Sequence, residues 1–198
     1  MSNMSPAKHL LVVTMLFLSL SMAVTTSQSS VGRTMSKEDI GLKTEKLTHF
    51  HFFLHAIISG PNIDDVNVAL PPPTSTTPAA DALFGRVDVV DIPMTIGPNI
   101  SSERIGSFQG VVAGVSPVEE LTYFMEVAFI FTEGKYNGST LVMLGRNQAT
   151  MKLRELPIVG GTGIFRFARG YALTRTYSPF DTKTGIAIYE YDLYALHY

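Results

Sequence analysis

Seven segments of the chain are predicted to be β-strands, and this pattern limits the fold more than any other feature. They are rich in aromatic and β-branched residues and span 48–59, 84–95, 108–114, 121–132, 139–153, 164–177 and 184–197. Clusters of Gly, Pro, Asn and Ser separate them, and none keeps the apolar period of a helix. The pattern predicts one all-β domain over residues 48–198, folded as an antiparallel barrel or sandwich.

The strand predicted over 121–132 is apolar on both faces. Its odd-numbered positions are all apolar, and its even-numbered ones, which include Phe124, Ala128 and Ile130, are also largely apolar, with Glu126 as the one charge. A strand with one face in water shows a clean alternation of apolar and polar residues instead. One face is therefore predicted to lie in the core, and the other in a subunit contact or a ligand cavity.

The composition excludes several functional classes. The 198 residues include no Cys, which rules out a disulfide framework, a cysteine nucleophile and a thiolate metal site. The net charge of −2 provides no basic surface for nucleic acid. A small exported domain without disulfides needs another source of stability, and we expect a large core or oligomerisation to supply it.

Residues 1–23 are predicted to be a secretory signal peptide. Lys8 precedes an apolar run that ends with small residues at Ser21 and Ala23, three and one positions before the expected cleavage site. The alternative is an uncleaved anchor, but the run is short for a membrane span and contains two serines. The mature protein is thus expected to be secreted, with neither a membrane nor nucleic acid as a partner.

Three further features concern the surface of the exported chain. Residues 24–47 are rich in Ser, Thr and charged groups and are predicted to form a flexible N-terminal arm. The proline-rich stretch at 70–80 is predicted to be an extended loop. The sequons at Asn99 and Asn137 lie beside turn-forming residues, as exposed N-glycosylation sites do.

His49, His51 and His55 share one face of the first predicted strand, because side chains alternate along a strand. A His-x-His pair on a strand can bind zinc. The sequence offers no acidic partner at a convincing spacing, and the alternative is a strand whose polar residues are exposed. We predict no metal site.

The glycine-rich segment at 158–163 resembles a phosphate-binding loop only superficially. No Gly-Lys-Ser/Thr follows it, and the next segment is strand-like rather than helical. These glycines are predicted to allow positive φ angles in a tight connection between strands. No Gly-x-Ser-x-Gly motif is present, so a serine hydrolase is not predicted either.

Isolated polar residues on apolar strands are the remaining candidates for chemistry. They are Asp88, Asp91, Glu126, Asn147, Arg154 and Arg169. A carboxyl group in an apolar cavity has a raised pKa and can act as a general acid. An arginine there can stabilise a phenolate or quinone oxygen. For each residue alone, a structural ion pair or simple exposure is the alternative.

Over residues 48–198 the chain resembles the plant dirigent proteins. The matching segments are FFLH at 52–55, FGRVDVVDIPMT at 84–95, GSFQG at 106–110, YNGSTL at 136–141 and, most specifically, RELPIVGGTGIFRFARG at 154–170. The resemblance implies an eight-stranded antiparallel β-barrel without a cofactor, secreted to the apoplast and assembled as a trimer. Such proteins orient phenoxy radicals that a separate laccase or peroxidase produces. One branch, the pterocarpan synthases, instead acts on quinone methides and closes a ring by dehydration.

The resemblance also implies a set of site residues. Arg154 and Asp91 match the family pattern, but Ala56 and Asn147 stand where lignan-forming members carry aspartates, and 111–113 lack the usual tyrosines. We predict Arg154, Asn147 and Glu126 as catalytic residues. We predict that Asp91, His55 and Tyr171 bind substrate.

Three functions are consistent with this sequence. The protein could direct the stereochemistry of phenoxy radical coupling, as in lignan formation, without being an enzyme itself. It could be a quinone-methide cyclase, which would be a true lyase. It could also bind a phenolic compound or a glycan of the cell wall without directing chemistry, since a fold does not determine a function.

Overall fold

The structure is a computed structural model that describes residues 31–70, 83–117 and 121–198. The expected signal peptide, the start of the arm and nearly all of the proline-rich loop lie outside these residues. Two compact units are distinguished, Met1–Gly41 and Leu42–Tyr198. The described part of the first contains one 3-10 helix, η1 (Glu38–Ile40). No helix among the described residues is long and apolar enough to cross a membrane.

The described residues of the second unit form nine strands and two short 3-10 helices. The strands are β1 (Lys46–Ile57), β2 (Asp65–Ala69), β3 (Val87–Thr95), β4 (Arg104–Gly114), β5 (Thr122–Phe131), β6 (Thr140–Gln148), β7 (Arg154–Thr162), β8 (Arg169–Asp181) and β9 (Ile186–His197). The helices are η3 (Gly134–Tyr136) and η4 (Gly163–Phe165).

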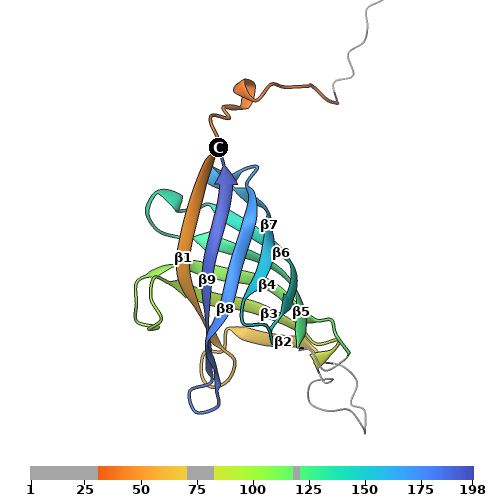
Figure 1. Ribbon diagram of the computed structural model, residues 1–198, viewed down its shortest axis with the longest axis vertical. Coiled ribbons are helices and arrows are strands. Elements are labelled where there is room, and N and C mark those ends of the chain that lie inside the picture. Colours follow the sequence, from red (N-terminus) through yellow and green to blue (C-terminus); the bar gives the residue numbers. More distant parts are fainter. Residues whose placement is uncertain (1–30, 71–82, 118–120) are drawn as a thin grey trace, which may run out of the picture. The chain divides into compact units, whose positions relative to one another are not determined.

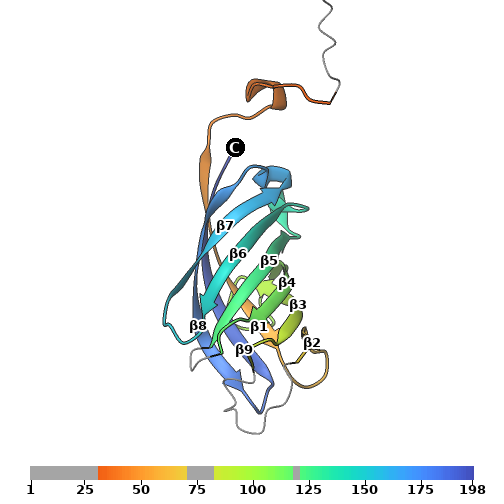
Figure 2. The ribbon, with the colours of Figure 1, turned by 90° about the vertical axis from the view of Figure 1, so that its right-hand side faces the viewer.

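Eight of these strands close into an antiparallel barrel, as expected. Their order is β1-β9-β8-β7-β6-β5-β4-β3, and the barrel closes where Phe53 and Leu54 of β1 pair with Thr95 and Met94 of β3 (Figures 1 and 2). The short β2 pairs with the opposite end of β3 and is additional to the eight. Closure removes the long free edges that would otherwise invite aggregation.

The glycine-rich segment is a strand, so the expected tight connection is wrong. Gly160 and Gly161 belong to β7, and of the three glycines at 160–163 only Gly163, with φ +62°, adopts a positive φ. Gly161 is needed for close approach, because a Cβ atom there would lie 2.4 Å from the carbonyl oxygen of Thr140 on β6. The apolar pattern did not predict this strand, because its glycines have no side chains that would show an alternation of faces.

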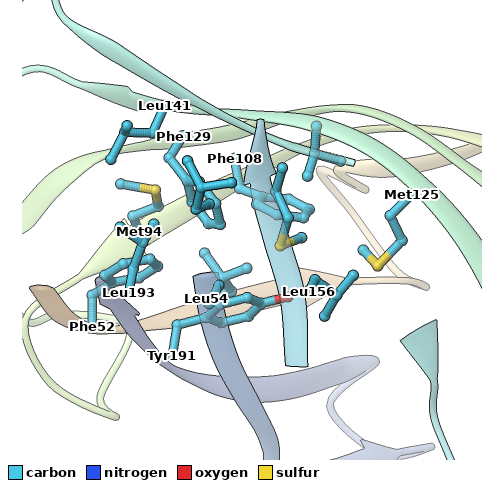
Figure 3. Packing of buried hydrophobic residues seen from close by; sticks show 14 of the residues in the cluster. Phe52, Leu54, Met94, Phe108, Met125, Phe129, Leu141, Leu156, Tyr191 and Leu193 are labelled. Atoms are coloured by element: carbon cyan, nitrogen blue, oxygen red, sulfur yellow. The ribbon is translucent and has the colours of Figure 1, made fainter. Parts of the chain in front are cut away.

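Aromatic side chains fill the barrel from one end to its middle. Phe50, Phe131, Tyr136 and Phe165 stack on one another at the end where β9 finishes. Further along the barrel axis, the rings of Phe52, Phe108, Phe129 and Tyr191 pack with centroids 5.4–6.1 Å apart (Figure 3). A cavity that can hold a ligand lies toward the other end, where β9 begins.

Candidate functional site

A cavity of about 160 Å³ lies inside the barrel at the end where β1 finishes and β9 begins. Its wall combines apolar and aromatic side chains with a small group of polar ones. The apolar residues include Leu54, Ala56, Ile92, Phe108, Val112 and Met125; the polar ones are Asp65, Arg86, Asp88, Tyr123, Asn147, Arg154, Thr174, Tyr189 and Tyr191. Such a wall suits a flat aromatic ligand with a few hydroxyl groups.

Arg154 is the buried cation of this cavity. It is only 4% exposed at the start of β7, where Nη1 donates to the carbonyl of Ala149 (3.2 Å) and to Thr176 Oγ1 (3.0 Å). Its Nε is buried without a partner, and no carboxylate of the described residues pairs with the guanidinium. A buried charge without a counter-ion is costly, so this side chain is poised to receive an anionic oxygen.

Three tyrosines of the cavity wall have phenol groups that stay protonated. Burial raises the pKa of Tyr123 and of Tyr189, and it raises the pKa of Tyr191 to about 12. The positive charge of Arg154 opposes this effect at Tyr189 and Tyr191 without cancelling it. These hydroxyls can therefore act as neutral hydrogen-bond donors toward a ligand oxygen.

Asn147 contributes an acceptor next to these donors. Its Nδ2 donates to the sulfur of Met125 at 3.1 Å, and its Oδ1 is buried without a partner among the described residues. An unsatisfied buried carbonyl is costly unless a ligand or water donates to it. A ligand hydroxyl is the natural donor in this cavity.

The wall formed by β2 and β3 carries the carboxyl groups. Arg86 Nε donates to both oxygens of Asp88 at 2.8 Å, and Asn67 Nδ2 donates to one of them at 3.2 Å. Asp65, on the inward face of β2, has a buried Oδ1 without a partner. Burial, and to a lesser extent the charge of Asp88, raises the pKa of Asp65, while Arg86 lowers it.

These two polar groups lie on opposite walls. Three strands separate β3 from β7 in either direction around the barrel, namely β4, β5 and β6 or β1, β9 and β8. Arg154 therefore faces Asp65 and the Arg86–Asp88 pair across the cavity. A ligand between them contacts a cation at one end and a carboxyl group at the other.

Arg154 and Asn147 are the two predicted site residues that line this cavity. The other predicted catalytic residue, Glu126, does not: it is exposed on the outer face of β5, because its neighbours Met125 and Val127 point inward. Asp91 is exposed for the same reason, between the buried Val90 and Ile92 of β3. These two positions cannot serve the cavity.

Tyr171 also lies outside the barrel. It is 39% exposed on β8 and stacks on Tyr194 with the ring centroids 4.9 Å apart. Tyr171, which we predicted to bind substrate, therefore does not line this cavity. Side-chain size did not mark the inner face of β8, because its buried residues Ala172 and Thr174 are the small ones.

His55 is fully buried, but it is not part of the cavity wall. Its Nε2 lies 2.7 Å from Thr95 Oγ1, and burial lowers its pKa, so it is neutral. It faces a separate depression on the outer surface, which Asn99 and Tyr177 also line. His55, which we predicted to bind substrate, is thus placed at this outer depression and not in the Arg154 cavity.

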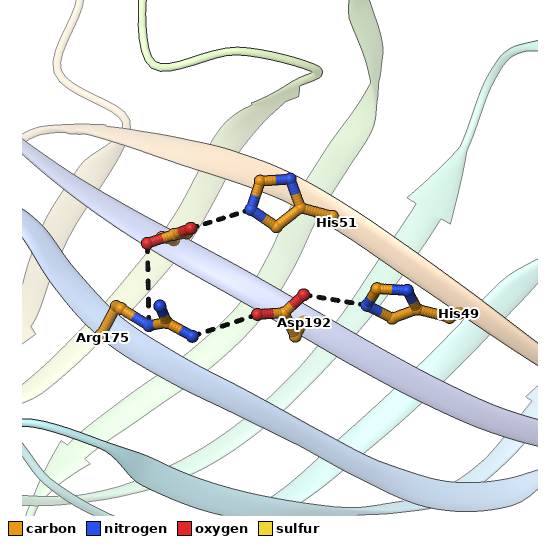
Figure 4. A network of polar contacts seen from close by, with 5 residues as sticks. His49, His51, Arg175 and Asp192 are labelled. Atoms are coloured by element: carbon orange, nitrogen blue, oxygen red, sulfur yellow. Dashed lines mark hydrogen bonds and ion pairs between the residues drawn. The ribbon is translucent and has the colours of Figure 1, made fainter.

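The other two histidines of β1 belong to an outer polar network. His49 pairs with Asp192 and His51 with Glu190, each at 2.8 Å, and Arg175 joins the two carboxylates (Figure 4). Within the described residues, no group of three or more His, Asp or Glu side chains could hold a metal ion. Asn99 and Asn137, the two sequon residues, are exposed.

Sequence reasoning missed Asp65, Tyr123 and Tyr189. Asp88 was noted as a polar residue on an apolar strand but not chosen, although its parity with Val90, Ile92 and Met94 placed it on the more apolar face. Tyr123 shared its parity with the apolar Met125 and Val127. No signal pointed to Asp65, because β2 is short and only its pairing with β3 brings it to the cavity.

A sequence model of the family described as "Dirigent-like protein" matches residues 47–196. The chain belongs to the dirigent family. Dirigent protein 21 of Arabidopsis thaliana is 43% identical to it over 96% of this chain and 98% of the relative. Pterocarpan synthase 1 of Glycine max is 43% identical over 92% of this chain and 94% of the relative.

The dirigent barrel also matches a solved structure. That structure, of a pterocarpan synthase dirigent protein, is 40% identical, superposes with a TM-score of 0.71, and is matched over 84% of this chain and 89% of its own. The Arg154 cavity of this dirigent chain therefore lies in a barrel fold shared with a pterocarpan synthase. Both the plain dirigent proteins and the pterocarpan synthases are relatives at about the same identity.

Proposed function

We propose that this dirigent protein is a quinone-methide cyclase, which closes a ring in a phenolic substrate by dehydration. The observation that carries the proposal is the buried guanidinium of Arg154, which has no carboxylate partner among the described residues and lies in a cavity walled by tyrosines. A phenolate or quinone-methide oxygen supplies the missing negative charge. The similarity to pterocarpan synthases supports the same chemistry.

The size of the cavity supports one substrate molecule rather than two. Its volume of about 160 Å³ is close to the ~150 Å³ of an engineered protein cavity that holds one benzene ring. One ring fits in the inner part, and the remainder of the substrate extends toward the mouth. An intramolecular ring closure needs one molecule per barrel, whereas radical coupling brings two together.

The reaction needs no oxidant. A phenol with a benzylic hydroxyl group loses that hydroxyl as water and loses its phenolic proton, which leaves a quinone methide. A second hydroxyl group of the same molecule then adds to the benzylic carbon, and the quinone-methide oxygen regains a proton. The net change is the loss of one water. Arg154 stabilises the oxygen that becomes negative, and the walls hold one face of the ring toward the attacking hydroxyl.

Stereo-directed radical coupling is the second candidate. Its support is the similarity, over nearly the whole chain, to relatives known simply as dirigent proteins. In this case a separate laccase or peroxidase generates a phenoxy radical, Arg154 orients its oxygen, and a second radical reaches the first from the mouth. Secretion to the apoplast, assembly as a trimer and glycosylation at the exposed Asn99 and Asn137 are part of either proposal.

One assay distinguishes the two candidates. The purified protein is incubated without oxidant with an isoflavan-4-ol that carries a ring-closing hydroxyl, and separately with coniferyl alcohol plus laccase, and products are separated on a chiral column. We expect a cyclised, enantiomerically enriched product in the first reaction. Racemic lignan in the second reaction and unconsumed isoflavanol in the first would leave only a binding function.

Arg154→Ala tests the role of the buried guanidinium. We expect kcat/KM to fall by roughly 10²-fold or more, the usual loss when one group that stabilises a developing oxyanion is removed. The matched control is Arg175→Ala on the outer surface, which we expect to retain wild-type kcat/KM. A wild-type rate in Arg154→Ala, or equal losses in both variants, would remove the support for this site.

A further inference from the structure

Ring closure by dehydration needs an acid, and the expected positions do not provide one. Hydroxide is a poor leaving group, so the benzylic hydroxyl must be protonated as its bond to carbon breaks. Two positions of the cavity wall at which an aspartate was expected hold Ala56 and Asn147, and neither can donate such a proton. The carboxyl groups that do line the cavity are those of Asp65 and Asp88.

Asp88 is already fully engaged. Its two oxygens accept hydrogen bonds from Arg86 Nε at 2.8 Å, and Arg86 Nη2 and Asn67 Nδ2 add contacts at 2.8 and 3.2 Å. Both oxygens of this carboxylate are therefore already occupied by donors from Arg86 and Asn67. Its role is to hold a fixed negative charge beside Asp65.

Asp65 has the opposite surroundings. Its Oδ1 is buried and lacks a hydrogen-bond partner, in a wall that also contains Tyr123 and Tyr189. Burial and the neighbouring charge of Asp88 both favour the neutral acid, and they raise the pKa of Asp65 against the weaker opposing effect of Arg86. Two adjacent carboxyl groups with such different environments are the usual arrangement of an acid and a fixed charge.

We propose that Asp65 is the catalytic acid of this barrel and acts on the benzylic hydroxyl while Arg154 holds the phenol oxygen at the opposite wall. This inference rests on the proposed function. Short β2 brings a carboxyl group to the cavity: its pairing with β3 sets Asp65 opposite Val90, which also lines the cavity.

The protons balance over the whole reaction. Asp65 donates its proton to the benzylic hydroxyl, the C–O bond breaks and water leaves. The phenolic proton passes to solvent at the mouth, and the quinone-methide oxygen lies against Arg154. The ring-closing hydroxyl then adds to the benzylic carbon and gives its proton to the Asp65 carboxylate, which restores the acid, while the former quinone oxygen takes a proton from solvent. One water is lost in total.

The test uses the isoflavan-4-ol assay with the full-length mature protein. We expect Asp65→Asn to lower kcat by roughly 10²–10⁴-fold, the usual contribution of a general acid, with the dissociation constant of the cyclised product unchanged by calorimetry. Asp65→Glu should restore part of kcat. The matched control is Glu126→Gln on the outer face of β5, which should keep wild-type kinetics.

A pH profile adds a measurement that a purely structural role would not change. For wild type, kcat/KM should fall as pH rises through the raised pKa of Asp65, and Asp65→Asn should lose this limb. Asp64, Arg86, Asp88, Tyr123 and Tyr189 are the charged or titratable groups that act on or lie around Asp65. Because burial raises the pKa of the neighbouring Asp64 as well, the limb must persist in Asp64→Asn.

The outcomes separate a failure of the proposed function from a failure of the assignment of Asp65. If wild type does not cyclise the substrate, the proposed function fails, whatever Asp65 does. If wild type is active and Asp65→Asn keeps its kcat, the assignment of Asp65 is wrong and the function stands. If Asp65→Asn does not fold, Asp65→Glu decides: a lowered kcat with unchanged product affinity supports the assignment, and a wild-type kcat overturns it.

Discussion

Asp64, which precedes the cavity residue Asp65, makes stability depend on pH. Its Oδ1 accepts a hydrogen bond from Ile57 N at 2.7 Å, but its Oδ2 is buried without a partner. Burial raises the pKa of Asp64 from 3.8 to about 7, and the charges of Asp65 and Asp91 add to this against the hydrogen bond from Ile57. The contact between this carboxyl group and β1 is therefore most stable when the carboxyl group is protonated.

The free energy of unfolding is thus expected to fall as pH rises. In the unfolded chain Asp64 ionises near its ordinary pKa, whereas in the folded barrel it stays neutral up to a pH of about 7. Its stabilising contribution is complete below the lower pKa and is lost as pH rises through the higher one. Because the group is partly exposed, we expect a loss of about 1–2 kcal/mol, less than the full shift would give.

Asp64→Asn should remove most of this pH dependence. The amide keeps an oxygen to accept the Ile57 hydrogen bond and carries no charge at any pH. Urea unfolding at pH 5 and pH 8 measures the difference, with Asp39→Asn in the first unit as the control that should behave as wild type. A wild-type barrel with equal stability at both pH values would contradict the prediction.

Strand β7 depends on a glycine that permits close packing. Gly161 pairs with Leu141 of β6, and a Cβ atom on it would lie 2.4 Å from Thr140 O and 2.7 Å from Phe165 Cβ. Phe165 belongs to η4 and stacks on Tyr136 at the closed end of the barrel. Close approach at Gly161 therefore lets η4 fold back over that end.

Gly161→Ala and its neighbour Gly160→Ala form a matched pair. A Cβ atom on Gly160 meets nothing within 4 Å, so the same substitution is harmless there. We expect Gly161→Ala to lower the free energy of unfolding by about 2–3 kcal/mol, as overpacking does, and Gly160→Ala to change it by less than about 0.5 kcal/mol. Thermal melts compare them, and similar losses in both would show that close packing at Gly161 is not the cause.

The barrel has two different outer sides. Outside β1, β9 and β8 lies the ion-pair network of His49, His51, Arg175, Glu190 and Asp192. A row of residues that pair from strand to strand crosses the outside of β3, β4, β5 and β6. It consists of Val89, Val111, Glu126 and Leu144. The side chains of Val89 and Val111 are 45% and 40% exposed. An exposed row that is apolar except for Glu126 is consistent with a subunit contact.

Val111→Arg tests whether this row joins subunits. We expect the wild-type protein to sediment as an oligomer, a trimer if it follows the resemblance to dirigent proteins, and Val111→Arg to weaken assembly at least ~10-fold because the contact would bury an unpaired charge. The barrel should remain folded, since this side chain points outward. Tyr171→Arg on the other side is the control. A monomeric wild type, or a variant that assembles normally, would contradict the prediction.

Aromatic and β-branched composition, with turn residues between the strands, was enough to predict the all-β class, and local motifs were enough to predict the family and Arg154. Both depend on residues close together in the chain. The inner face of each strand was harder to assign. Glu126 is one position away from the inward Met125, and Asp91 is three positions away from the inward Asp88. A shift by an odd number of positions moves a side chain to the other face of the strand.

Tertiary structure decided which polar residues meet. Asp65 lies on a short strand that no local pattern reveals, and it reaches the cavity because β2 pairs with β3. Arg154 faces it because barrel closure sets β7 and β3 on opposite walls. A chain of alternating residues encodes strands and their apolar faces by local sterics and hydrophobicity. Which side chains share one cavity depends on strand order and register, and those follow from contacts between residues far apart in the chain.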